Sequence, residues 1–298
     1  MNDTLRFAAI DIGSNAVRLF FSYVFETKLG PVFKKASLIR LPIRLGEDSF
    51  HNHEIEEHKI LELIAALKAF KQLMVAFRVI SYKACATSAM RDAVNGKELI
   101  KRIEKETGIV IDVIEGEEEA DIIFENDISK VASLDTQIYM DVGGGSTEFT
   151  VIHKGNRICS KSFNIGTIRL KDDLVHKSDW KDLKKWLVSI KKGYKPTALV
   201  GSGGNINTLF KMSFLHPMVP LSKRRLKKIY KELKALTFDE KIAIMKLRPD
   251  RADVIIPATE LFLLALSKTG AKEIIVPQVG LVDGIVHSLY REHKEKNS

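Results

Sequence analysis

Short apolar runs and longer helical repeats alternate along this chain. An apolar run typical of a buried strand covers residues 5–12, and further strands are expected at 17–25 and 33–41. Between residues 55 and 77, apolar positions recur every three or four residues, which predicts an amphipathic helix of about six turns. A strand, a helix and a further strand are expected at 78–84, 97–107 and 109–114. The first part of the chain is therefore predicted to be a β-β-β-α-β-α-β unit.

The same order of elements starts again near residue 137. Asp11 and Asp141 each end an apolar strand, and in both cases a glycine-containing turn and another strand follow. A repeat of so long a period indicates a duplicated domain rather than a solenoid. We therefore predict an α/β protein of two domains, residues 1–125 and 126–298, with the boundary near Glu125. Further expected elements of the second half are strands at 148–153, 157–163, 197–200 and 273–277 and helices at 180–192, 223–236 and 252–269.

The two glycine-rich turns are candidate phosphate-binding sites. They read Asp11-Ile12-Gly13-Ser14-Asn15 and Asp141-Val142-Gly143-Gly144-Gly145-Ser146. Backbone N–H groups on the inside of such a bend can hold phosphate oxygens, and glycine permits their close approach. The preceding aspartates would repel phosphate, so Asp11 and Asp141 are candidate ligands, directly or through water, for a Mg²⁺ ion. One such hairpin alone could be only a tight turn, but two matched copies and a third glycine cluster at 201–204 favour phosphate binding.

Composition and charge limit the classes of partner. The chain has 298 residues, a net charge of +9 and a sequence pI near 9.3, which favours binding of polyanions. It contains neither a P-loop motif nor a dinucleotide-binding G-x-G-x-x-G motif. No apolar run reaches the roughly 20 residues of a membrane span, and the N-terminus lacks the features of a signal peptide. We therefore expect a cytoplasmic protein that binds neither a membrane nor nucleic acid.

These motifs resemble those of the exopolyphosphatase and guanosine pentaphosphate phosphohydrolase family, which belongs to the actin-like fold group. The segment Ile10–Asn15 is similar to the first phosphate motif of the family, and Asp141–Glu148 to the second. Ala86–Ala93 resembles the segment that carries the substrate-contacting arginine, here Arg91, and Gly116–Ala120 resembles the segment with the catalytic glutamate, here Glu119. The resemblance implies two ribonuclease-H-like domains with an interdomain cleft.

The family resemblance also implies roles for individual side chains. Glu119 would orient or deprotonate the attacking water, although the residues 117–119 could equally be acidic residues that favour the start of a helix. Glu148 could approach the same cation or water, or be a surface carboxylate of an edge strand. Arg91 could bind successive phosphates with its guanidinium, or lie on the surface of a short helix.

The function expected from these observations is Mg²⁺-dependent hydrolysis of a terminal phosphoanhydride. The substrate would be inorganic polyphosphate or guanosine pentaphosphate, and the sequence does not separate the two. Two alternatives stay open: a phosphotransferase of the sugar-kinase or acetate-kinase type, and a non-catalytic regulator that binds polyphosphate or nucleotides. A homodimer is a further expectation.

Overall fold

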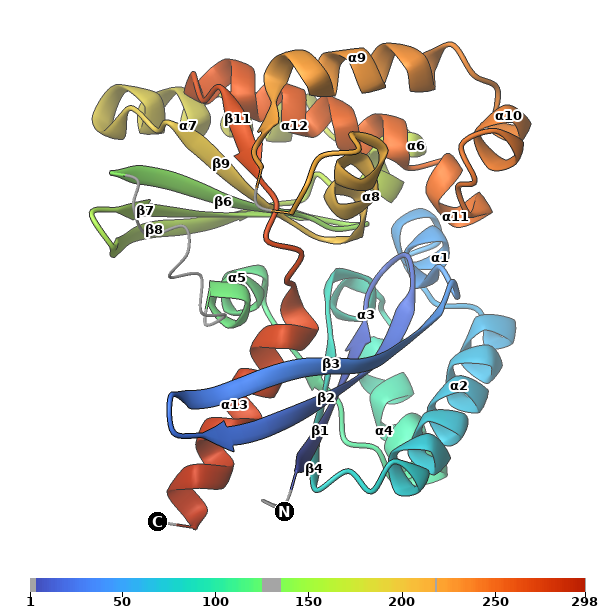
Figure 1. Cartoon of the computed structure of the whole chain (residues 1–298). Helices are drawn as coiled ribbons and strands as arrows, with labels where there is room; N and C mark the ends of the chain where they lie inside the picture. The colour runs from blue at the N-terminus through green and yellow to red at the C-terminus, as the bar shows by residue number, and fades with distance from the viewer. Residues whose placement is uncertain (1–3, 125–134, 218, 298) are drawn as a thin grey trace. The chain divides into compact units, whose positions relative to one another are not determined.

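The chain folds into two compact units, seen here in a computed structural model that describes residues 4–124, 135–217 and 219–297 (Figure 1). Unit 1 consists of Met1–Asn126 together with Gly280–Ser298, and unit 2 of Asp127–Val279. The predicted boundary at Glu125 lies outside the described residues. The segment 280–298, which we assigned to the second domain from the sequence, packs in unit 1.

The sheet of unit 1 has the strand order β3-β2-β1-β4-β5. Strand β2 pairs antiparallel with β1 and β3, whereas β4 pairs parallel with β1 and β5. Every residue of β1 from Phe7 to Ile12 is buried, as expected for a strand covered on both faces of a sheet. The strands are β1 (Leu5–Ile12), β2 (Val17–Thr27), β3 (Gly30–Leu41), β4 (Ser81–Ala86) and β5 (Asp112–Val113).

Helix α13 (Leu281–Lys296) covers one face of this sheet, which explains why the end of the chain belongs to unit 1. Its apolar residues, among them Leu281 and Ile285, form one core cluster with Phe7 of β1 and Cys85 of β4. Gly284 allows α13 to approach α5 (Gly116–Phe124) closely, because a Cβ there would lie 1.9 Å from the carbonyl oxygen of Ile122.

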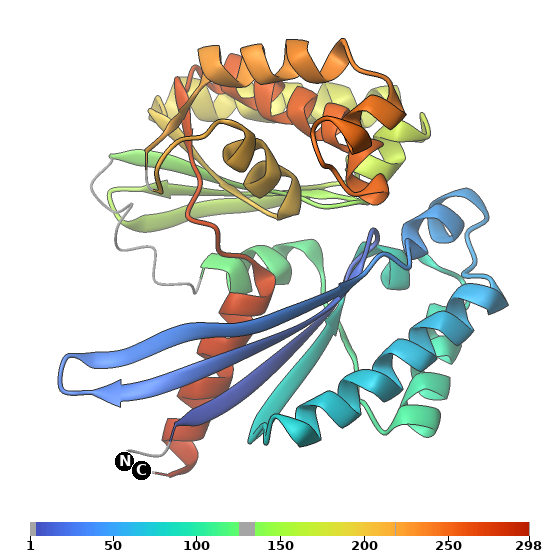
Figure 2. The ribbon, with the colours of Figure 1, turned by 45° about the vertical axis from the view of Figure 1, so that its right-hand side comes forward.

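The other face of the sheet in unit 1 carries α2 and α4, which pack against each other (Figure 2). Burial of Leu63, Leu67 and Phe70 follows the helical spacing seen in the sequence. The remaining helices of the unit are short. The helices on this side and at the strand ends are α1 (Leu45–His51), α2 (Glu57–Ala76), α3 (Ser88–Asp92) and α4 (Gly96–Thr107).

The sheet of unit 2 has the order β10-β11-β9-β6-β7-β8. Strands β6, β7 and β8 form an antiparallel meander, and β9 pairs parallel with β6, as β4 does with β1 in unit 1. The order 8-7-6-9 therefore repeats the order 3-2-1-4, which confirms the duplication inferred from the sequence. The strands are β6 (Thr136–Val142), β7 (Thr147–His153), β8 (Asn156–Phe163), β9 (Ala198–Ser202), β10 (Leu221–Ser222) and β11 (Glu273–Ile275).

Helix α12 (Ile255–Thr269) is the central helix of unit 2. It packs against α6, α7, α8 and α9, and its Phe262 and Leu266 are fully buried in the core of the unit (Figure 1). Burying a side chain of this size is worth about 1.5–3 kcal/mol, so α12 contributes much of the stability of the unit. The other helices are α6 (Thr167–Lys171), α7 (Lys177–Tyr194), α8 (Gly204–Met212), α9 (Lys223–Lys234), α10 (Phe238–Ala243) and α11 (Pro249–Ala252).

Candidate active site

Each unit contains one of the two predicted hairpins, and their backbones have the same geometry. In unit 1 the N–H of Gly13 donates to the carbonyl of Ala16 at 3.2 Å, and in unit 2 the N–H of Gly143 donates to the carbonyl of Ser146 at 3.0 Å. Both bonds close a turn between antiparallel strands whose register is equivalent. The repeat predicted from sequence is thus also present at the level of single hydrogen bonds.

The first hairpin is held by two neighbouring elements of unit 1. The hydroxyls of Ser14 and Ser88 lie 2.9 Å apart, and the N–H of Gly46 in α1 donates to the Ser14 carbonyl at 2.9 Å. Ser14 and Asn15 are 3% and 7% exposed. Because Ser88 begins α3, the helix that carries Arg91, this contact couples the turn to the predicted phosphate-binding arginine.

The residue opposite the aspartate differs in charge between the two hairpins. Asp11 faces Arg18 in the strand register, and the two side chains form an ion pair. At the equivalent place in unit 2, Asp141 faces Glu148, and a carboxylate oxygen of each lies within 4.8 Å of the other. Two like charges so close disfavour each other's ionised form unless a cation lies between them. Of the two aspartates, Asp141 therefore fits a cation ligand better than Asp11 does.

Neighbouring hydroxyls complete the surroundings of these two carboxylates in unit 2. The hydroxyl of Ser162 donates to Glu148 at 3.0 Å, and Glu148 is 2% exposed. Ser202, at the end of β9, donates its hydroxyl to Asp141. Gly203 follows with φ 93°, and a Cβ at this position would lie 2.8 Å from an oxygen of Asp141. The third glycine cluster predicted at 201–204 thus packs directly against the second hairpin. Oxygen atoms of this kind suit a hard divalent cation such as Mg²⁺.

The start of α6 fixes the peptide groups of the second hairpin. The N–H groups of Thr167 and Ile168 donate to the carbonyls of Gly143 and Gly144 at 3.0 and 2.8 Å. The guanidinium Nε of Arg169 donates to the Gly145 carbonyl at 2.9 Å. Within the described residues, no acceptor takes the N–H of Gly144 or Gly145. The start of α6 therefore binds the carbonyl groups of the turn, and the N–H groups of Gly144 and Gly145 are available to bind an anion.

Gly166 makes this packing possible, and the sequence reasoning missed it. A Cβ on Gly166 would lie 2.3 Å from the carbonyl oxygen of Gly144. Gly166 lies three residues after the end of β8 and is the N-cap of α6, a position where glycine is among the preferred residues. The signal was available, but nothing in the sequence linked this helix to the glycine turn more than 20 residues earlier.

Glu119 and Arg91 both lie in unit 1. Glu119 is half-buried in α5, whereas Glu117 and Glu118 are exposed, so burial singles out the predicted glutamate. Arg91 in α3 donates to the carbonyl of Ile114 at 3.0 Å and lies 3.6 Å from the carboxylate of Glu115. Arg91 therefore also ties α3 to the segment that leads into α5, a contact that the sequence did not suggest.

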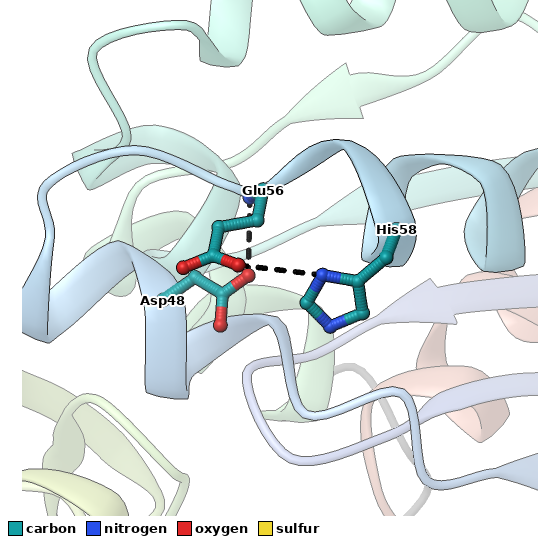
Figure 3. A group of neighbouring side chains, drawn as sticks. All are labelled: Asp48, Glu56 and His58. Atoms are coloured by element: carbon teal, nitrogen blue, oxygen red, sulfur yellow. Dashed lines mark hydrogen bonds and ion pairs between the residues drawn. The ribbon is translucent and has the colours of Figure 1, made fainter.

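A second group of possible metal ligands lies in unit 1, at Asp48, Glu56 and His58 (Figure 3). One oxygen of Asp48 is 2.6 Å from the ammonium of Lys59, and the other accepts the N–H of Glu56 at 3.1 Å. His58 is exposed and 3.4 Å from Glu56. Because Lys59 already neutralises the buried Asp48, this group holds the start of α2 and does not form a metal site.

The two cysteines take no part in the hairpins. Both are free, and burial raises the pKa of the Cys85 thiol to about 12. The thiol is therefore protonated at neutral pH and unreactive.

Among the described residues, no helix is long and apolar enough to cross a membrane.

The chain belongs to the Ppx/GppA phosphatase family, whose model matches residues 26–293. The match begins after the first hairpin, whose turn has the same closing hydrogen bond and strand register as the second. Structures similar to the chain include the Ppx/GppA family member of Aquifex aeolicus, with a TM-score of 0.78, 26% identity, and coverage of 98% of this chain and 99% of that one. An exopolyphosphatase from Cytophaga hutchinsonii gives a TM-score of 0.82 and 27% identity, over 96% of this chain and 98% of that one.

Two curated proteins illustrate the range of relatives. Exopolyphosphatase 2 of Mycobacterium tuberculosis is 26% identical over 95% of this chain and 98% of its own length. A bifunctional 3-dehydroquinate synthase/phosphatase of Fusobacterium nucleatum is 31% identical over 93% of this chain. The chain spans only 45% of the length of that second relative. The predicted family and the actin-like α/β fold class are therefore confirmed.

Proposed function

We propose that this phosphatase-family protein releases the terminal phosphate of inorganic polyphosphate, of guanosine pentaphosphate, or of both, with Mg²⁺ as cofactor. The observation that carries the proposal is the second hairpin, where N–H donors for an anion lie beside two facing carboxylates. A polyphosphate end carries several negative charges, so a site for it needs both hydrogen-bond donors and a cation. The names of the exopolyphosphatase relatives support the same substrate class.

Asp141 and Glu148 would hold the cation, which supplies charge neutralisation for the phosphoanhydride. The N–H groups of Gly144 and Gly145 would bind oxygens of the terminal phosphoryl group and stabilise the charge that develops on them. We assign the orientation of the attacking water to Glu119. The first hairpin, in which Arg18 neutralises Asp11, would contribute backbone donors and not a metal site.

The test is phosphate release from a panel of defined substrates with and without Mg²⁺. Tripolyphosphate, long-chain polyphosphate, guanosine pentaphosphate, ATP and pyrophosphate would be compared at equal phosphoanhydride concentration. We expect Mg²⁺-dependent release from polyphosphate or guanosine pentaphosphate and little from ATP. Transfer of the phosphate to glucose or acetate, in place of release to water, would refute the hydrolase. Binding of polyphosphate without any turnover would show a regulator.

A further inference from the structure

Helices α7 and α9 carry the positive charge of the whole chain. Helix α7 has six lysines against two aspartates, and α9 has seven lysines and arginines against one glutamate. Together the two helices have a net charge of +10, whereas the complete chain has +9. The rest of the sequence is therefore nearly neutral, and the basic character of the protein is a property of these two helices.

Both helices pack against α12 and belong to the same helical layer of unit 2 (Figures 1 and 2). Each turns an apolar side to the core, at Leu183 and Leu187 in α7 and at Leu226 and Leu233 in α9. At 100° per residue, the basic residues fall on the opposite, exposed sides. We call these exposed residues the basic face: Lys177, Lys181, Lys185 and Lys192 of α7, and Arg224, Lys227, Lys228 and Lys231 of α9.

The fold itself makes little use of these charges. Among the described residues, the basic face forms a single ion pair, between Lys228 and Glu232 at 3.9 Å. The first turn of α9 contains Lys223, Arg224 and Arg225 and no acidic residue. Positive charges at the start of a helix oppose its dipole. Charge that is unfavourable to the helix and unpaired within the fold is available to an external polyanion.

The chemistry of the surface favours a polyanion without bases or lipid tails. Trp180 of α7 is half-buried, and the ammonium of Lys184 lies 5.5 Å from its ring centre. Its ring is therefore not an open platform for the bases of single-stranded nucleic acid. None of the exposed large hydrophobic residues that the structure describes lies on α7 or α9, so an apolar anchor in a lipid surface is also absent there.

We propose that the basic face binds the distal part of a long inorganic polyphosphate chain while the end of that chain occupies the second hairpin, which lies in the same unit. This inference rests on the proposed function and adds a second point of attachment to it. A chain that reaches both places gains affinity from the second contact without any change at the first. The affinity for polyphosphate therefore increases with chain length, whereas the turnover of a short substrate does not depend on the basic face.

The experiment measures binding of fluorescently labelled long-chain polyphosphate by anisotropy with Mg²⁺ present, in a Glu119→Gln background in which turnover is slow. The kcat for tripolyphosphate is measured separately with Glu119 intact. Two triple variants, K181Q/K185Q/K192Q and R224Q/K227Q/K231Q, remove three charges each from exposed positions. A matched control, K97Q/K101Q/K105Q, removes three exposed lysines from α4 in unit 1. Circular dichroism verifies that all three variants are folded.

We expect each basic-face variant to raise the Kd for the long chain about tenfold or more. Each variant should also lower the slope of log Kd against log salt concentration by about 2, because each of the three lost phosphate contacts contributes roughly 0.7 to that slope. The control variant should bind the long chain with the Kd of the wild type. The kcat for tripolyphosphate should be unchanged in all three variants. Unchanged binding in both basic-face variants, or an equal loss in the control, would overturn the proposal. The proposal would also be overturned if single-stranded RNA displaced the labelled polyphosphate at a lower phosphate concentration than unlabelled polyphosphate does.

The outcomes also separate this proposal from the proposed function. If the wild-type protein binds long polyphosphate through the basic face but hydrolyses no substrate, the basic face stands and the hydrolase is wrong. If tripolyphosphate is hydrolysed and the variants bind long chains like the wild type, the hydrolase stands and the basic face is wrong.

Discussion

Replacing Gly166 with alanine should displace the second phosphate-binding turn without disturbing the rest of unit 2. The new Cβ would lie 2.3 Å from the carbonyl oxygen of Gly144 and 2.4 Å from the carbonyl carbon of Gly145. These atoms belong to the backbone, so no side chain can rotate away. Ordinary van der Waals contact begins at 3.4 Å, so the turn and the start of α6 must separate by about 1 Å.

A shift of this size affects both the hydrogen bonds and the reaction. The bond from the Ile168 N–H to Gly144 is 2.8 Å long, and a separation of about 1 Å would take it beyond the range of hydrogen bonding. We expect overpacking to cost about 1–3 kcal/mol of stability. A misplacement of about 1 Å near the reacting group lowers the rate by about 10²-fold, so kcat for short polyphosphate should fall by that factor.

The assay is steady-state phosphate release by Gly166→Ala, with the free energy of unfolding measured by urea denaturation. Gly193→Ala, in the last turn of α7, is the control, because no atom lies within 4 Å of its added Cβ. This control should keep full activity and gain up to about 1 kcal/mol, since alanine favours a helix. A Gly166→Ala protein that is folded and retains the kcat of the wild type would refute the role assigned to this contact.

Four further predictions concern the carboxylates and the arginine. Glu119→Gln should lower kcat by about 10²–10⁴ with little change in substrate binding, and an equal loss in Glu118→Gln would contradict the choice of base. Asp141→Asn should shift the Mg²⁺ titration of activity to higher concentration, whereas an unchanged titration would remove this residue from the cation site. Arg91→Ala should raise KM more than it lowers kcat, with partial rescue by lysine; a loss confined to kcat would instead indicate that Arg91 acts by positioning α5. Desolvation raises the pKa of the Asp283 carboxyl above its ordinary value of 3.8, so the folded state binds this proton more tightly than the unfolded state does. The stability that this group contributes is therefore present below pH 3.8 and is lost as the pH rises through the pKa of the folded state. Asp283→Asn should therefore flatten the dependence of Tm on pH in that window, and a wild-type profile would contradict it.

Hydrophobic periodicity predicted the long elements well because burial on one side determines them. The strand at 5–12 and the helix at 55–77 match β1 and α2 within a residue or two. Short helices such as α1 and α3 were not predicted, since five to seven residues give no measurable period. Residues 109–114 gave only the two-residue strand β5, because this edge of the sheet pairs with β4 at just two positions.

In the candidate site, too, some features could be predicted from the sequence and others could not. The glycine turns and their aspartates could be found because chemistry and spacing repeat within the chain. The contrast between Arg18 and Glu148 could be read only after the strand register placed each opposite its aspartate. The contacts of Gly166 and Ser88 with the turns depend on how distant segments pack, for which a single sequence carries no direct signal.

The return of α13 to unit 1 makes unit 2 an insertion between two parts of one folding unit. A fragment that ends at residue 126 would expose the apolar side of β1 and β4, including Phe7 and Cys85, and should aggregate when expressed alone. Unit 2, by contrast, is one continuous segment and is a candidate for separate expression. Joining α5 to α13 by a short flexible linker should restore unit 1, since the two helices already touch at Gly284. Unit 1 and unit 2 could then be mixed as separate polypeptides. A substitution in one unit could be tested in the presence of the unaltered other unit.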